Sequence, residues 1–175
     1  MESFLLKLQT LINALYEHPE SDTNELVFKC LVGLWESNEP ILIPAKKDKD
    51  GTVYLASVKG NNTRNKQPIL MTEKSIDGKE LANTIIFNQD WLVFFTDDTF
   101  FENRKGMTLM YGTLDNLINH YKEHESDYLG IIVNPYQGNN SLHLTAHLLG
   151  VLSGLRDSYR ESKAFENDNL SKVMV

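Results

Sequence analysis

Two short apolar runs, Trp91–Phe95 and Leu129–Val133, constrain the fold of this chain more than any other feature. They are rich in aromatic and β-branched side chains, which β-strands favour. Each run ends in residues that stop a strand, because Thr96-Asp97-Asp98 can cap a helix and Asn134-Pro135 turns the chain out of a sheet. Both runs are far shorter than the roughly 20 apolar residues of a membrane span. We therefore expect two buried strands and no membrane partner.

Apolar residues at spacings of three and four predict helices on both sides of these runs. Two helices lie at the N-terminus, one from Phe4 to Leu15 and one from Asp22 or Thr23 to a point before Pro40. A short helix over Asp97–Arg104 follows the first apolar run. Two further helices are expected, one over 113–121 and one from about 145 to 159.

The remaining segments predict additional strands, over 41–43, 52–58, 68–72, 84–87, 107–111 and 142–144. The sequence therefore predicts an α+β fold, with two N-terminal helices and a mixed or antiparallel sheet of about five to seven strands on which helices pack. We expect one domain over residues 1–160. Residues 161–175 lose the apolar periodicity, which predicts a frayed C-terminal tail.

Composition limits the class of protein, its cellular location and its possible partners. Hydrophobic residues make up 41% and charged residues 23% of the 175, near the values of globular domains. A single cysteine and the absence of a secretory signal pattern at the N-terminus predict a cytoplasmic location. The net charge of −7 argues against nucleic-acid binding. Residues 46–66 hold six basic and two acidic residues, and we interpret this segment as solvated hairpin ends.

No local motif for catalysis is present. His120 and His124 are four residues apart on an expected helix and could bind a metal with a third ligand such as His143 or His147. The zinc-protease order His-Glu-x-x-His is absent, so we expect histidines without a metal, and no cofactor. Ser153 lacks the Gly-x-Ser-x-Gly context of a nucleophile. Cys30 lies on an apolar helical face, where a buried thiol is inert.

Several ordered segments resemble the N-terminal domain of the bacterial enhanced-serine-sensitivity (SseB) family. Residues 90–97 are similar to a family strand that ends in Phe-Thr-Asp, and residues 128–136 to one that ends in Gly, three apolar residues, Asn-Pro and an aromatic residue. The helix between them and the segment Leu26–Pro44 also match the pattern, so the resemblance covers about residues 22–155. It implies an α+β fold and a cytoplasmic setting. The family name records a phenotype, and longer members carry a second domain that this pattern does not include.

The expected function is a non-catalytic module that binds a protein or a small ligand. The two strand ends can form one binding crevice, and its candidate residues are Phe95, Thr96, Asn134, Pro135 and Tyr136. Alternatively, these residues serve only a structural role, as helix caps and turns. Two alternatives stay open: a small metal-assisted hydrolase that uses His120 and His124, and a protein that forms homo-oligomers through an apolar patch.

Overall fold

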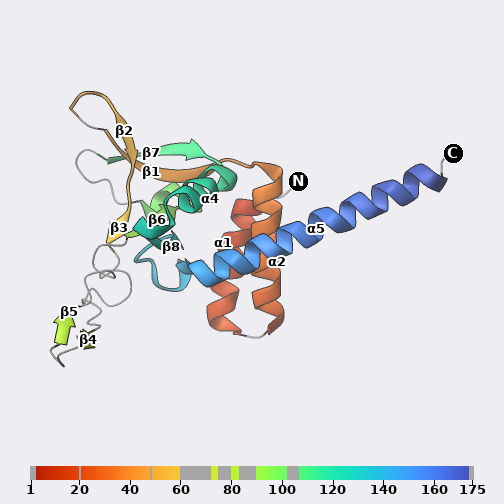
Figure 1. Cartoon of the computed structure of the whole chain (residues 1–175), viewed down its shortest axis with the longest axis horizontal. Helices are drawn as coiled ribbons and strands as arrows, with labels where there is room; N and C mark the ends of the chain where they lie inside the picture. The colour runs from red at the N-terminus through yellow and green to blue at the C-terminus, as the bar shows by residue number, and fades with distance from the viewer. Residues whose placement is uncertain are drawn as a thin grey trace.

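The computed structural model describes residues 3–19, 21–47, 49–59, 72–74, 80–82, 90–101 and 107–173. It begins with two packed helices, α1 (Phe4–Glu17) and α2 (Ser21–Ser37), which stand side by side in Figure 1. The Ser3 hydroxyl caps α1 by accepting from the backbone N–H groups of Leu5 and Leu6. The Glu39 carboxylate accepts from Phe4 and Leu5 at the same end, where a negative charge favours the positive end of the helix dipole.

The strands form two main sheets. The first has the order β2-β1-β7 and is antiparallel throughout, with β1 (Ile41–Lys47), β2 (Val53–Leu55) and β7 (Met107–Gly112). The second has the order β3-β6-β8-β9 and contains β3 (Val58–Lys59), β6 (Asp90–Phe94), β8 (Tyr128–Val133) and β9 (Leu142–Thr145). Within it β6 and β8 run parallel and the other pairs are antiparallel. A separate pair joins β4 (Thr72–Lys74) and β5 (Glu80–Ala82).

Backbone hydrogen bonds connect the two main sheets. The Phe95 N–H, just after β6, donates to the Leu42 carbonyl of β1 at 2.8 Å. The Ala56 N–H, between β2 and β3, donates to the Pro44 carbonyl at 2.9 Å. The sheets therefore form one mixed surface, in which β2 and β3 occupy the gap between β1 and β6. The expected α+β fold is confirmed, while the strand expected at 84–87 and most of that at 68–72 lie outside the described residues.

One face of this sheet carries the hydrophobic core. Strand residues such as Ile43, Phe94 and Val133 point into a single cluster with apolar residues of α1, α2, α4 (Leu114–Glu123) and α5 (Ala146–Val173). Because side chains alternate along a strand, their neighbours lie on the opposite face. We call that side the second face, and its strand residues include Leu42, Pro44, Lys46, Trp91, Val93, Phe95, Ile132 and His143.

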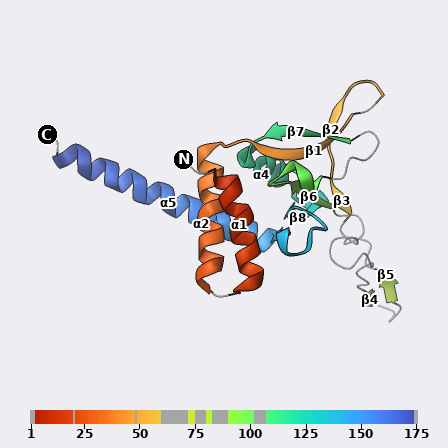
Figure 2. The same ribbon diagram turned by 180° about the vertical axis from the view of Figure 1, so that it is seen from behind.

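Helix α5 is longer than the sequence indicates. It continues to Val173, through the residues where we expected a frayed tail, and it extends away from the body of the molecule (Figures 1 and 2). The Arg156 guanidinium holds the helix to α2, since it lies 4.0 Å from the centre of the Trp35 ring and donates to Glu36 at 2.5 Å. Arg160 donates to the same carboxylate at 2.7 Å. Within the described part of the chain, no helix combines the length and the apolar character needed to cross a bilayer.

The short helix expected over Asp97–Arg104 differs from the structure. It is a single 3-10 turn, η2 (Asp98–Phe100), followed by extended backbone at Phe101, and residues 102–106 lie outside the described part. The Asp97 side chain caps it by accepting from the Thr99 N–H at 2.9 Å. An acidic cap is needed at the start of a single turn as much as at the start of a long helix, because both begin with free backbone N–H groups. The capping pattern therefore predicts where the turn begins but not its length.

Candidate functional site

The two strand ends singled out by the sequence lie side by side. Because β6 and β8 are parallel and Phe94 pairs with Val133, the two strands finish next to each other at the same end of the sheet. The fully buried Asn134 joins them: its Oδ1 accepts from the Thr96 N–H at 2.9 Å, and its Nδ2 donates to Thr96 Oγ1 at 2.8 Å. The same Nδ2 donates to the Asn140 carbonyl at 2.9 Å. Thr96 and Asn134 therefore satisfy each other and form a structural clamp.

The loop that follows the clamp has an unusual backbone. Asn134 and Tyr136 have φ values of 52° and 63°, in the left-handed region that a side chain such as Tyr rarely occupies. Ser141 braces the loop by donating to the Asn134 carbonyl and accepting from the Gln137 N–H at 3.0 Å. The left-handed conformation costs roughly 1–2 kcal/mol per residue, and it turns Tyr136 toward solvent, where 42% of it is exposed.

A pocket of about 290 Å³ opens on the second face beside this loop. Its walls come from β1, the β2–β3 segment, β6, η2, the start of β7 and the loop after β8. The lining residues are Pro44, Lys46, Ala56, Ser57, Val58, Val93, Phe95, Phe100, Phe101, Met107, Pro135, Tyr136 and Gln137. Phe95, Pro135 and Tyr136 are thus in the wall, whereas the other two candidates, Thr96 and Asn134, belong to the clamp.

The polar groups of the pocket wall are engaged elsewhere. The Ser57 hydroxyl donates to Asp90 Oδ2 at 2.7 Å, and the Gln137 amide donates to the Phe100 carbonyl at 3.5 Å. Lys46 is the one charged side chain among the described residues that line the pocket. The described part of the wall is mainly apolar, and Lys46 adds a cation, a combination that suits an apolar group with an anion beside it.

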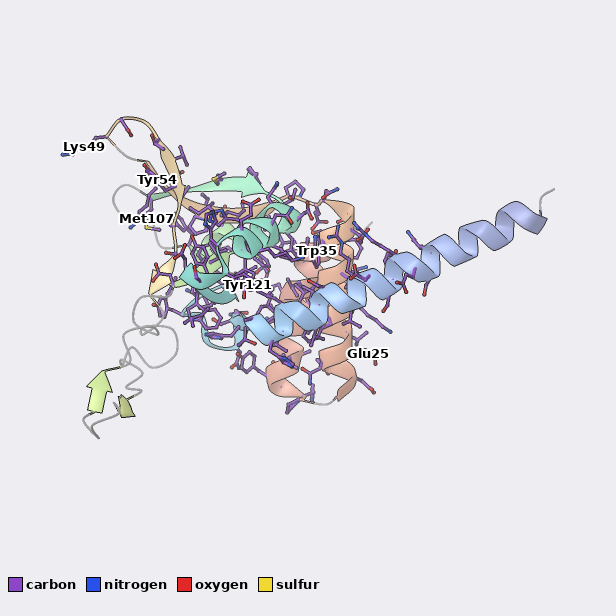
Figure 3. All side chains as sticks on the ribbon, viewed as in Figure 1. Glu25, Trp35, Lys49, Tyr54, Met107 and Tyr121 are labelled. Atoms are coloured by element: carbon purple, nitrogen blue, oxygen red, sulfur yellow. The ribbon has the colours of Figure 1, made fainter. Side chains whose placement is uncertain are left out.

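Two further exposed tyrosines lie on the second face, in addition to Tyr136 in the pocket wall. Tyr54 pairs with Lys46 and Tyr111 pairs with Leu42, and directly paired residues share a face. Their exposed fractions are 53% for Tyr54 and 76% for Tyr111. Figure 3 shows Tyr54 and Met107 at the end of the sheet away from α1 and α2. We call Tyr54, Tyr111 and Tyr136 the aromatic rim. The sequence did not reveal this group, because its members come from three separate strands and loops.

His120 and His124 lie close together, but the structure gives them other neighbours than metal ligands. His124 lies one residue past the end of α4, and its ring centre is 4.7 Å from that of His120. His120 Nε2 is 3.2 Å from the Tyr128 hydroxyl, and burial, followed by the charge of His124, lowers the pKa of His120. Within the described ranges, no three or more His, Cys, Asp or Glu side chains are grouped to hold a metal ion.

His143, named above as a possible third ligand, is partly buried on β9. Its ring meets Trp91 edge-on, with ring centres 5.4 Å apart. It points away from Leu144, because side chains alternate along a strand. His147 is exposed on α5 and Ser153 is half-buried on the same helix.

The buried Cys30 thiol donates to the Phe4 carbonyl at 3.2 Å, in the core position that the helical pattern indicated. Of the basic segment 46–66, Lys46 and Lys49 are exposed at the β1–β2 hairpin, and residues 60–66 lie outside the described part.

The fold and site define an α+β domain with helices on one sheet face and an apolar pocket with an aromatic rim on the other. Comparison of the chain with models of protein families, with curated proteins and with solved structures gives no match.

Proposed function

We propose that this protein is a non-catalytic binding module that takes an apolar side chain of a protein partner into the pocket of its second face. The observation that carries the proposal is the apolar pocket with Tyr136 in its wall and with Tyr54 and Tyr111 exposed on the same sheet face. Tyrosines are enriched at binding hot spots, because they bury a large apolar ring and keep a hydroxyl for a hydrogen bond. An apolar pocket on a face with exposed tyrosines suits an anchor side chain of a partner.

The size of the pocket favours a side chain over a large ligand. Small-molecule sites typically enclose about 300–1,000 Å³, and this pocket of about 290 Å³ is at the bottom of that range. It suits one aromatic or branched aliphatic group. Lys46 at the wall favours a partner with an acidic residue beside that anchor.

We also propose a relationship to the N-terminal domain of the SseB family and a cytoplasmic location. The two strand-end motifs support the relationship, and the lone cysteine supports the location. The alternative of a hydrolase that uses His120 and His124 has weaker support, since their neighbourhood offers no third described ligand.

The test compares matched variants in affinity capture from a lysate of the native cell, with mass spectrometry of the retained proteins. Val58→Trp fills the pocket, and Tyr54→Ala removes an exposed ring of the rim. Tyr159→Ala is the control, because this tyrosine is 41% exposed on α5, away from the second face. We expect a protein that is retained by the wild type and the control and is lost with the other two variants.

Two results would refute the proposal. One is a partner that all four proteins retain equally, which would place its binding site elsewhere. The other is the absence of any protein retained above background. Circular dichroism of each variant would verify that the fold is intact.

A further inference from the structure

We infer that the outer edge of β7 pairs with β7 of a second copy of this chain, so that the sheet continues across a two-fold axis. Strand β7 pairs with β1 on one side, from Ile41↔Gly112 to Lys46↔Met107. On its other side no strand of the described residues pairs with it. It lies along the upper margin of the sheet in both Figure 1 and Figure 2. Strand β7 also carries Met107 of the pocket wall and the exposed Tyr111, but the edge would pair through its backbone. Its test measures self-association, whereas the test of the proposed function measures capture of another protein.

The edge of β7 lacks the features that prevent strands from pairing with other molecules. Natural edge strands are usually short, bulged, or interrupted by charges or proline. Strand β7 has six residues, Met-Thr-Leu-Met-Tyr-Gly, with no charge and no proline, and its pairing with β1 shows no register shift. The outer strand of the other sheet, β9, has four residues and leads directly into α5. The long, uncharged edge is therefore specific to β7.

A second copy of β7 complements this edge by symmetry. A two-fold axis perpendicular to the sheet makes the strands antiparallel and keeps each side chain on its own face, so one residue lies opposite its own copy across the axis. If Leu109 lies opposite its copy, Thr108 faces Met110, and if Met110 lies opposite its copy, Met110 faces itself. Neither register brings like charges together, although each chain carries a net charge of −7. The exposed Met110 and Tyr111 gain a cross-strand neighbour in both registers.

The size of the contact predicts a weak dimer. Six strand residues span about 20 Å, and such a pair buries less than the roughly 1,200 Å² of a stable interface. We therefore expect the monomer to predominate at low concentration and the dimer to form as the concentration rises. Sedimentation equilibrium from about 1 to 500 µM should show the mass rise from 20.0 kDa toward twice that value.

A charge swap tests whether β7 forms the contact. Thr108→Lys with Met110→Lys places lysines opposite each other in both registers, and both side chains are exposed, so the monomer should fold normally. We expect dimerisation to weaken by at least about tenfold, because like charges directly opposite destabilise a strand pair. The corresponding double Glu variant should behave alike. Mixing the two variants should restore a dimer, since in both registers a lysine at position 110 then faces a glutamate, at position 108 or 110.

The matched control is Leu6→Lys with Leu26→Lys, which adds the same charge at exposed sites on α1 and α2. It should dimerise as the wild type does. The inference is overturned if the wild type stays a monomer over the whole concentration range, or if the β7 lysine variant dimerises like the control. Failure of the mixture to form a heterodimer would also overturn it.

Discussion

Replacing Asn134 tests whether the clamp between the two strand ends stabilises the fold. Its side chain is fully buried and makes three hydrogen bonds, two to Thr96 and one to the Asn140 carbonyl. Asn134→Ala leaves the Thr96 N–H and the Asn140 carbonyl without these partners, at about 1–3 kcal/mol for each buried group. The alanine must also adopt a φ of 52°, which adds roughly 1 kcal/mol. We expect a total loss of about 3–7 kcal/mol.

Such a loss is large, since domains of this size unfold with about 5–15 kcal/mol. Urea denaturation followed by circular dichroism measures it. Asn134→Gly separates the two contributions, because glycine accepts the positive φ but makes none of the hydrogen bonds, and it should be less destabilised than the alanine variant by about 0.5–1 kcal/mol. Asn140→Ala is the control: its carbonyl, the group that the clamp uses, is retained, so its loss should stay below about 1 kcal/mol. A loss below about 1 kcal/mol for Asn134→Ala would refute the reasoning.

Three further changes test other parts of the structure. Gly130→Ala places a Cβ 2.1 Å from the Leu144 carbonyl oxygen, so β8 and β9 must separate. We expect the free energy of unfolding, measured in urea, to fall by more than about 4 kcal/mol, or no folded protein to form. A small decrease would contradict the pairing of the two strands. Arg156→Ala removes the hydrogen bond to Glu36 and should lower the free energy of unfolding, measured in urea, by about 1–2 kcal/mol. Arg156→Lys should recover only part of this loss. The pKa of His120 in the folded protein lies below its ordinary value of 6.5, so the unfolded chain takes up the proton first and stability falls as the pH drops below 6.5. We expect His120→Gln to reduce this fall, measured as the change of melting temperature with pH. An unchanged slope would count against the burial of His120.

Local patterns in the sequence determined most of the elements. The apolar runs Trp91–Phe95 and Leu129–Val133 became β6 and β8, because aromatic and β-branched side chains favour a strand whatever lies beside it. Thr113 begins α4 as predicted, since its hydroxyl accepts from the Asn116 N–H at 3.1 Å. Helical periodicity found α1 and α2 within a few residues of their ends. These interactions join residues at most four positions apart, so the sequence contains them directly.

Tertiary structure alone decided how these elements combine. The parallel pairing of β6 with β8 brings Thr96 within hydrogen-bonding distance of Asn134, 38 residues away. The strand-end pattern pointed to Phe95, Pro135 and Tyr136, but the pocket also needs residues of β1, β2–β3, η2 and β7. Loss of periodicity suggested fraying after residue 160, yet α5 continues to Val173. Contacts of this kind depend on which distant segments the core brings together, and only the packing of the whole chain selects them.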